Sequence, residues 1–298
     1  MPDVLLVGHV VKDRFPDDED RQTPGGTAYY AAIALASLGL RVKVVTKVAP
    51  DDRDLLLTEL IEAGIEVVQG ETPATTEFVH RFPQGRAGER VLTLPQRAEP
   101  FAPQDLGTSP AALGYAGPLS VRDVPTVTLQ ALRALCGRVA IDLQGLVRQV
   151  EGDSIMLRGS AQARKALALA QVVKADLTEA EVVTGEREPE AAARALAGLG
   201  PEEAIVTMSD RGSVAFCEGA SVRLPAFPPE PFADATGCGD TYLAAYLCAR
   251  LGDAHPREAA GFAAAAAACK LQWKGPLRRS ADDVRRFLRR HEPSGAPG

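Results

Sequence analysis

Short apolar segments rich in β-branched residues alternate with longer amphipathic segments along most of the chain. This alternation is typical of a parallel sheet covered by helices. The pattern predicts strands at Val4 to Val10, Val42 to Val48, Ala112 to Ala116, Val139 to Leu143, Val172 to Ala175 and Ala204 to Met208. It predicts helices at Thr27 to Leu38, Arg53 to Ala63, Val127 to Leu135, Ala161 to Ala170, Glu190 to Leu199, Gly239 to Leu251 and Arg257 to Leu271. A terminal hairpin is expected from the segments Val214 to Cys217 and Val222 to Leu224.

Residues 65 to 96 carry a different pattern, in which apolar and polar residues partly alternate. Alternation of this kind indicates antiparallel strands with one face solvated or covered by a partner. The segments are Ile65 to Val68, Thr75 to Phe82 and Arg90 to Leu94, with turns at Gly70 to Pro73 and Pro83 to Gly88. We expect them to form a small β-strand lid, mainly from about 65–96 with part of 10–24.

The rest of the organisation follows from these two patterns. Lys12 to Pro24 reads as a polar loop with an acidic stretch at Asp17 to Asp20, and the Pro/Gly-rich tail from Glu292 to Gly298 is expected to fray. We predict a single α/β domain over 1–298, with three α/β/α layers around a mostly parallel central sheet and the small lid.

Composition narrows the class of protein. The 298 residues carry a net charge of −6, which argues against a nucleic-acid partner. No apolar run approaches the ~20 residues of a membrane span, and the first residues lack a basic region and a cleavage site. The five cysteines include no Cys-x-x-Cys pair, so a disulfide framework or zinc site is not expected and a reducing cytoplasm fits best.

The segment Asp234-Ala235-Thr236-Gly237-Cys238-Gly239-Asp240-Thr241 precedes an apolar helix. Its glycines allow the backbone to approach a ligand, and the amides and dipole at a helix N-terminus favour an anion. Asp240, in the first turn, is either a helix cap or a base for an acceptor hydroxyl. An anion cradle beside a carboxylate is the combination that phosphoryl transfer requires.

Competing motifs are absent. A dinucleotide fingerprint would need glycine where Tyr242 stands and should follow the first strand. The Gly-Lys dipeptide of a P-loop and the Gly-x-Ser-x-Gly of a nucleophile elbow do not occur. A dehydrogenase or another unrelated α/β enzyme is therefore disfavoured.

The segment Asp234 to Asp240 resembles the Asp-Thr-x-Gly-Ala-Gly-Asp signature of the ribokinase-like (PfkB) carbohydrate kinases. Gly25-Gly26, Leu38-Gly39 and Asp51-Asp52 resemble the family's Gly-Gly helix, its Leu-Gly end and the acidic turn after the next strand. Weaker similarities lie at residues 142–148, 176–179 and 206–212, so the resemblance spans roughly Val4 to Arg290. It implies a ribokinase-like fold and an ATP-dependent kinase.

By this resemblance, Asp240 is the catalytic base that takes the proton of the acceptor hydroxyl. The amides of Gly237, Cys238 and Gly239 would form the anion hole for the γ-phosphoryl group. A nucleophilic thiol at Cys238 is the alternative, but no histidine lies near it in the sequence.

The acceptor site implied by the resemblance begins with Asp13, which would bind substrate hydroxyls unless it is an exposed loop carboxylate. Gly25 and Gly26 would admit the sugar close to the backbone, or simply form the turn into the helix. Tyr30 stands where many sugar kinases of the family have Asn, which argues against a plain ribokinase. It would stack on, or hydrogen-bond to, a cyclitol or nucleoside ring, or be buried against the lid.

Gln144 and Arg148 complete the expected acceptor site and point toward a polyol other than ribose. On the donor side, Glu179 would hold, through water, the Mg²⁺ that accompanies ATP, or else serve as a charge at a helix N-terminus. Asp176 replaces the family's Asn, and Lys174 would balance its charge. The remaining candidates for the nucleotide site, which could equally form ordinary turns, are Thr207, Ser209, Gly212 and Thr236.

We therefore expect an ATP- and Mg²⁺-dependent kinase that phosphorylates an alcohol of a sugar or related polyol. A cyclitol (inositol) or nucleoside kinase of the same family and a catalytically inactive sugar-binding protein remain alternatives, as does ADP as donor. A monovalent cation is a further candidate cofactor. Neither a nucleic acid nor a membrane is an expected partner, and a homodimer formed through the lid strands is a candidate assembly.

Overall fold

The central sheet is built on Val4–Val7 (β1), whose four side chains are all buried. In the computed structural model, which describes residues 1–81, 91–228 and 231–291, β1 belongs to a nine-stranded sheet of order β15-β14-β13-β12-β9-β8-β1-β4-β5. The other strands are β4 (Val42–Lys47), β5 (Glu66–Gly70), β8 (Ala111–Ala116), β9 (Cys136–Asp142), β12 (Val172–Asp176), β13 (Glu203–Thr207), β14 (Ser213–Cys217) and β15 (Ala220–Leu224). Neighbours pair in parallel from β5 to β13, whereas β14 and β15 pair antiparallel. The predicted mostly parallel sheet with a terminal hairpin is confirmed.

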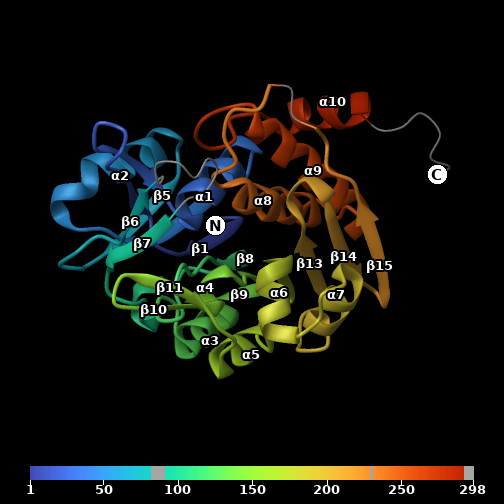
Figure 1. Cartoon of the computed structure of the whole chain (residues 1–298), viewed down its shortest axis with the longest axis horizontal. Helices are drawn as coiled ribbons and strands as arrows, with labels where there is room; N and C mark the ends of the chain where they lie inside the picture. Colours follow the sequence, from blue (N-terminus) through green and yellow to red (C-terminus); the bar gives the residue numbers. More distant parts are fainter. Residues whose placement is uncertain (82–90, 229–230, 292–298) are drawn as a thin grey trace.

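Two helical layers cover the sheet, as Figure 1 shows. One contains α1 (Thr27–Ser37), α2 (Arg53–Glu62), α8 (Cys238–Leu251), α9 (Pro256–Leu271) and α10 (Ala281–His291). The other contains α3 (Thr126–Leu135), α4 (Gln144–Val147), α5 (Ala161–Leu167), α6 (Leu177–Thr184) and α7 (Pro189–Ala197). Val4 and Leu6 belong to the first apolar core, while Leu5 and Val7 belong to the second, because successive side chains of a strand point to opposite faces. The predicted three-layer architecture is confirmed.

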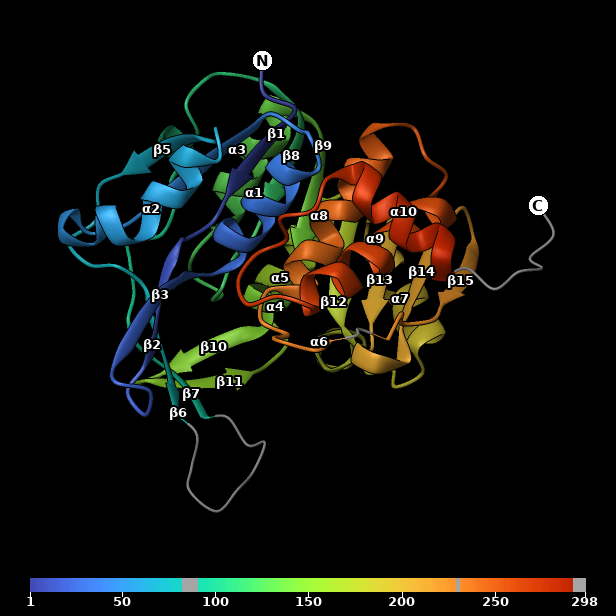
Figure 2. The same cartoon turned by 90° about the horizontal axis from the view of Figure 1, so that it is seen from above.

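A second sheet forms the lid, which projects to one side of the body in Figure 2. Its strand order is β10-β11-β7-β6-β2-β3. The strands are β2 (Val11–Phe15), β3 (Arg21–Gly25), β6 (Glu77–Arg81), β7 (Val91–Gln96), β10 (Arg148–Glu151) and β11 (Ser154–Leu157). A small apolar cluster of Val11, Phe78, Leu94 and Leu119 lies between this sheet and the body. Three separate segments of the chain therefore build the lid.

The structure corrects four expectations. The first strand ends at Val7, and the supposed polar loop at Lys12 to Pro24 is the hairpin β2–β3, with its acidic stretch in the turn. The polar side chains of this hairpin face the cavity or form ion pairs, so its sequence is as polar as that of a loop. Ile65 to Val68 falls largely in β5, which pairs in parallel with β4 in the main sheet and is not part of the lid. The strands β10 and β11 were not expected from the sequence at all.

Two predicted features cannot be compared with the structure. The Pro83 to Gly88 turn and the frayed tail lie outside the described residues. None of the helices in the described part of the chain is long and apolar enough to cross a membrane.

Candidate active site

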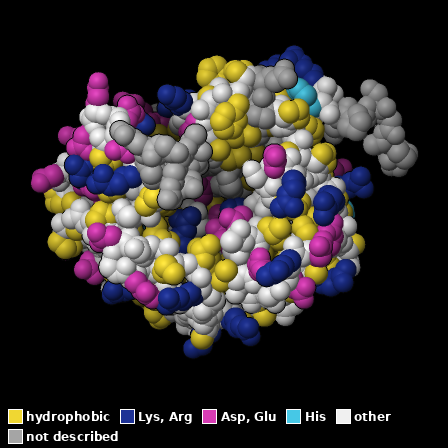
Figure 3. All heavy atoms as spheres, in the orientation of Figure 1, with side chains coloured by type: hydrophobic (Ala, Val, Ile, Leu, Met, Phe, Trp, Pro, Cys, Tyr) yellow, Lys and Arg dark blue, Asp and Glu magenta, His cyan; other side chains and the backbone are white. Residues whose placement is uncertain are grey.

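A cavity of about 1490 Å³ lies where the parallel strands end and α8 begins. Since the carboxyl ends of parallel strands meet at one edge of the sheet, the residues that follow β9, β12 and β13 come together there. Residues of the lid, including Asp13 and His80, line the same cavity as Asp240 of α8. In the space-filling view, basic and acidic side chains meet in a hollow on this face (Figure 3).

The loop before α8 has the geometry expected of an anion cradle. Gly237 is the N-cap residue, and its φ of 74° is a left-handed conformation that favours glycine. The amide of Cys238 donates to the carbonyl of Ala235 at 3.1 Å, so this predicted donor is already engaged in the turn. For the amides of Gly237 and Gly239, the described residues supply no backbone acceptor. Two of the three expected amides are therefore without a backbone acceptor in the described chain, and their role toward an anion stays a prediction.

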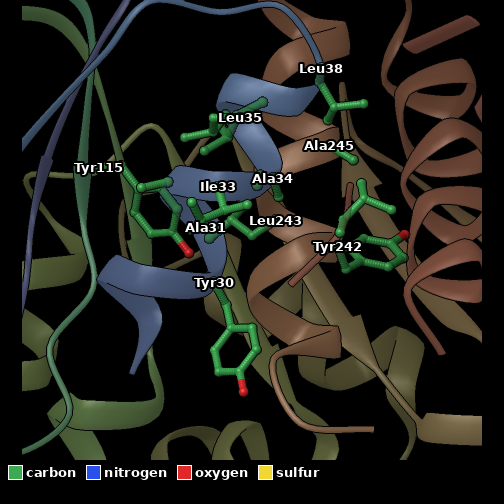
Figure 4. Packing of buried hydrophobic residues seen from close by; sticks show 14 of the residues in the cluster. Tyr30, Ala31, Ile33, Ala34, Leu35, Leu38, Tyr115, Tyr242, Leu243 and Ala245 are labelled. Carbon is green, nitrogen blue, oxygen red and sulfur yellow. The ribbon is translucent and has the colours of Figure 1, made fainter. Parts of the chain in front are cut away.

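Tyr30 lies directly against this loop. A Cβ atom on Gly237 would stand 2.2 Å from the Tyr30 ring, so glycine is required for this contact. Figure 4 shows the Tyr30 hydroxyl directed away from the other labelled side chains of the apolar cluster. Burial, followed by the negative charges of Asp13 and Asp234, raises the pKa of this phenol above its usual range. The ring of Tyr30 thus lines the cavity and packs on the loop before α8.

Asp240 lies in the first turn of α8. Burial, with a further contribution from Asp142, raises the pKa of its carboxyl to about 6. Lys174 acts in the opposite direction, as does the hydroxyl of Thr27. The carboxyl group of Asp240 is therefore mostly ionised at neutral pH, and its pKa lies close enough to neutral pH for it to accept a proton readily.

Lys174 pairs with Asp142, with Nζ 3.1 Å from Oδ2, and not with Asp176 as we expected. The reason is that β9 and β12 are neighbours in parallel register, with Lys174 opposite Asp142. Burial alone would lower the pKa of Lys174, but the charges of Asp142, Glu179 and Asp240 outweigh it and raise the pKa. A Cβ on Gly239 would lie 2.8 Å from Nζ, so the ammonium group stands against the anion loop.

Asp176 and Glu179 form a reciprocal capping box at the start of α6. The Asp176 carboxylate accepts from the Glu179 amide at 2.8 Å, and the Glu179 carboxylate accepts from the Asp176 amide at 2.9 Å. Burial and the charges of Asp142 and Asp176 raise the pKa of Glu179 to about 7, although Lys174 opposes them. The helix-terminal alternative for Glu179 is thus present in the structure, while its role toward Mg²⁺ stays a prediction.

Gln144 and Arg148 lie together. With its amide oriented toward the guanidinium, the Gln144 oxygen accepts from Arg148 at 2.5 Å. Burial lowers the pKa of Arg148, and the charges of Glu179 and Asp142 oppose that effect. Gln144 and Arg148 therefore line the cavity close to the negative charge of Asp142.

Asp13 is buried, with 5% of its surface exposed, so the alternative of an exposed loop carboxylate is wrong. Its Oδ1 lies 2.8 Å from Nε2 of His80, a residue that the sequence analysis did not select. A Cβ on Gly25 would stand 2.0 Å from Oδ2 of Asp13, and one on Gly26 would stand 2.7 Å from the carbonyl of His9. Gly25 thus leaves room for the Asp13 carboxylate, and Gly26 leaves room for the carbonyl of His9.

The remaining donor-side candidates also line the cavity. Thr207 donates to the carbonyl of Ala175 at 3.3 Å. Ser209 and Gly212 have φ values of 57° and 85° and form the tight turn between β13 and β14. The alternative of an ordinary turn is thus realised for both, and binding to a nucleotide stays a prediction.

Thr236 belongs to a small network that fixes the loop. Its amide and hydroxyl both donate to Oδ1 of Asp234, at 3.0 and 2.8 Å. The buried ammonium of Lys270 on α9 donates to the carbonyl of Asp234 at 2.7 Å. Lys270 could not be identified from the sequence, because nothing in an alanine-rich helix more than thirty residues away marks it as a partner of this loop.

The surroundings of Cys238 disfavour the thiolate form that a nucleophilic cysteine requires. Burial raises its pKa to about 11, and its Sγ lies 3.8 Å from the carbonyl of Ala267. Among the described residues, no group of three or more His, Cys, Asp or Glu side chains could hold a metal by itself.

Comparison with known proteins agrees with this geometry. The model of the family described as pfkB family carbohydrate kinase matches residues 1–282. The cytidine kinase of Thermococcus kodakarensis is 27% identical over 278 residues, which cover 87% of this chain and 96% of that protein. A solved pyrophosphate-dependent kinase of the ribokinase family, in a sulfate complex, superposes with a TM-score of 0.85 at 28% identity, covering 95% of this chain and 99% of that one. Another, bound to a pyrophosphate analogue and myo-inositol, has a TM-score of 0.83 at 27% identity, with 95% and 99% covered.

Proposed function

Because the chain belongs to the pfkB family of carbohydrate kinases, we propose that it transfers the γ-phosphoryl group of ATP to a hydroxyl of a sugar or related polyol. Family members are phosphotransferases with alcohol acceptors, and this chain is an enzyme of that class. The observation that carries the finer proposal is the position of Asp240. It lies one residue after the Gly239 amide, in a cavity that also contains Asp13.

In this proposal Asp240 accepts the proton of the acceptor hydroxyl as that oxygen attacks the phosphorus. A general base of this kind contributes about 10²–10⁴ in rate and acts best when its pKa lies near the working pH. A carboxyl with a pKa of about 6 satisfies that condition better than an ordinary aspartate.

The charge that develops on the transferred group is matched by donors already in place. The amides of Gly237 and Gly239 lie at the positive end of α8, and the ammonium of Lys174 stands against Gly239. Preorganised donors of this kind contribute about 10²–10³ each in comparable anion holes.

The residues present also fit a magnesium ion that accompanies the nucleotide. Mg²⁺ retains several waters and is bound through one or two carboxylates together with phosphates. Glu179 is a buried carboxylate whose pKa is raised to about 7, so a neighbouring divalent cation would favour its charged form. When bound, the ion supplies neutralisation of phosphate charge, and Glu179 with Asp176 would hold its water shell.

The acceptor is proposed to lie between Asp13 and Tyr30. Asp13 can accept hydrogen bonds from neighbouring hydroxyls, and the phenol of Tyr30 offers both a ring face and a polar end. The named relatives, a cytidine kinase and a kinase bound to myo-inositol, favour a nucleoside or cyclitol as strongly as a plain sugar.

A second donor, inorganic pyrophosphate, is favoured by a specific observation. The two pyrophosphate-dependent neighbours match this chain with TM-scores of 0.83 and 0.85 at 27% and 28% identity. Both donors require the same anion loop, so the donor must be decided by experiment.

The test is a matrix of donors against acceptors, read by separation of the phosphorylated product. ATP, ADP and pyrophosphate would each be combined with Mg²⁺ and with pentoses, hexoses, inositols and nucleosides. We expect ATP to support phosphorylation of one acceptor class, whereas turnover with pyrophosphate alone would reassign the donor. Acceptor-dependent thermal stabilisation without product in any combination would indicate a binding protein and overturn the kinase proposal.

A further inference from the structure

The lid supplies a buried partner to Asp13. Asp13 of β2 and His80 of β6 are joined by a 2.8 Å contact between Oδ1 and Nε2, and each residue is only 5% exposed. They are 67 positions apart in the chain, and the parallel pairing of β2 with β6 brings them together. A carboxylate only accepts hydrogen bonds, so the tautomer of His80 with a proton on Nε2 is the one that fits this contact.

The His80 ring is fixed by stacking. Phe15 lies parallel to it, with ring centroids 4.6 Å apart and an angle of 16° between the planes. The guanidinium of Arg21 lies over the Phe15 ring, 4.0 Å from its centroid. The stacking of Arg21, Phe15 and His80 restricts the orientation of the imidazole ring. It therefore also restricts the direction in which Nε2 can donate.

The basic residues on either side of Asp13 form ion pairs on the opposite face of β2. Lys12 pairs with Asp52 at 3.2 Å, and Arg14 pairs with Asp20 at 2.5 Å. Side chains alternate along a strand, so these two cations point away from the face that carries Asp13 and Phe15. Among the described residues of the lid, His80 is consequently the side chain in hydrogen-bond contact with Asp13.

The second oxygen of Asp13 is restricted by the backbone. Oδ2 stands where a side chain on Gly25 would begin, because a Cβ there would lie only 2.0 Å away. The carboxylate is therefore held between His80 on one oxygen and the bare Cα of Gly25 on the other, with the cavity in front.

We propose that His80 is a positioning residue that orients Asp13 toward the acceptor and makes acceptor binding depend on the lid strand β6. The inference rests on the proposed function, in which Asp13 binds the acceptor hydroxyls. The affinity of a ligand with two neighbouring hydroxyls should depend most on this orientation of Asp13, because both hydroxyls must donate to the same carboxylate.

The test compares two replacements of His80. The variant His80→Phe keeps an aromatic ring against Phe15 but removes the N–H donor, and His80→Gln restores an N–H near the position of Nε2. We expect His80→Phe to raise the KM of the acceptor about tenfold, as loss of a hydrogen bond to a charged group does, with smaller changes in kcat and in the KM of the donor. His80→Gln should recover most of that loss, and His255→Gln, at an exposed histidine, should behave as the wild type.

A double-mutant cycle separates positioning from a structural role. If His80 acts through Asp13, His80→Phe should have little further effect on acceptor affinity in an Asp13→Ala background. An equal loss in both backgrounds, or no rise in KM in the single variant, would overturn the proposal. Should His80→Phe fail to fold, the cycle is repeated with His80→Asn, whose shorter amide falls short of Asp13.

Binding of the acceptor, measured by calorimetry without turnover, tests the role of His80 separately from the kinase activity. A wild-type chain that binds the polyol but yields no product would contradict the kinase activity alone. The dissociation constants of the same variants would then decide the role of His80.

Discussion

The pKa of Asp240 is set by opposing effects of residues on three neighbouring elements. Burial at the start of α8 and the negative charge of Asp142 favour its protonated form, whereas Lys174 favours the ionised form. Lys174 is itself held by Asp142 at 3.1 Å. The basicity of one carboxylate therefore depends on a pair that lies on two neighbouring strands.

Replacement of Asp240 by Asn should remove nearly all turnover without preventing folding. The amide keeps the size of the side chain but cannot take a proton, so kcat should fall by about 10²–10⁴. Steady-state kinetics together with a melting curve check this, with Asp282→Asn on the exposed surface of α10 as the matched control. Turnover close to that of the wild type in Asp240→Asn would remove Asp240 from the role of base.

The pH profile should follow the pKa of Asp240. The base works when deprotonated, so kcat/KM should rise with pH through about 6 and then level off. Asp142→Asn removes a charge that raises this pKa and frees Lys174 to act on Asp240, so the acidic limb should move to lower pH. A limb that stays in place, or one that moves to higher pH, would mean that another group controls the rate.

At the scale of elements, the start of α8 is the feature that the rest of the site depends on. Its N-cap, Gly237, has a positive φ and supports the Tyr30 ring, while Asp234 is tied to α9 through Lys270. The anion loop is thus fixed by α1 on one side and by α9 on the other.

Gly237→Ala should damage catalysis more than stability. An added Cβ would meet the Tyr30 ring at 2.2 Å in a left-handed conformation, so the loop must move. We expect a loss of about 1 kcal/mol in stability and a fall in kcat of about 10²-fold, comparable with the loss of an anion-hole donor. Gly252→Ala, at the other end of α8 where φ is −92°, is the control and should leave kcat unchanged.

Sequence patterns predicted this element well and the lid poorly. The apolar helix after Asp240 and the alternation of strands and helices depend on local periodicity, so they were visible in one sequence. The strands β10 and β11 were missed, since residues such as Arg148 and Glu151 become strand residues through pairing with distant segments. Asp142 and Lys270 were missed as site residues for the same reason: only the register of the sheet and the packing of α9 bring them to the loop.

For the molecule as a whole, the far end of the sheet carries a buried ionic network. Glu203 begins β13, and Thr207 at the other end of the same strand lines the cavity. The Glu203 carboxylate accepts from Tyr246 at 2.5 Å, from Arg250 at 2.7 Å and from Arg138 at 2.8 Å. This network joins β13, α8 and β9 at the edge opposite the site.

Glu203→Gln should lower stability and leave acceptor binding unchanged. The Glu203 carboxylate is buried, but Arg138 and Arg250 stay partly exposed to water, so its loss should cost about 1.5–3 kcal/mol, the range for hydrogen bonds to charged groups. Urea denaturation measures this, and Glu181→Gln, which breaks an exposed pair with Arg187, should cost less than about 1 kcal/mol. A change in the KM of the acceptor would contradict the separation of this network from the site.

The same network gives stability a definite dependence on pH. Burial raises the pKa of Glu203, but the hydrogen bonds from Arg250, Tyr246 and Arg138 outweigh it, so the folded-state pKa lies below the ordinary 4.5. Its stabilising contribution is therefore complete above pH 4.5 and is lost as the pH falls through the folded-state value. The difference in unfolding free energy between wild type and Glu203→Gln should shrink over that acidic range.

The described strands of the lid lie at residues 11–25, 77–81, 91–96 and 148–157, with stretches of the central body between the first, middle and last of these regions. A growing polypeptide that has emerged from the ribosome only as far as residue 140 lacks the last two of these strands, and it also lacks α8. Synthesis must therefore deliver more than half of the chain before the lid sheet can close, and most of it before an acceptor and a phosphoryl group can meet. Long-range pairing of this kind slows folding. The edge of β7 that pairs with β11 therefore stays unpaired through much of translation, when association with other nascent chains is the competing reaction.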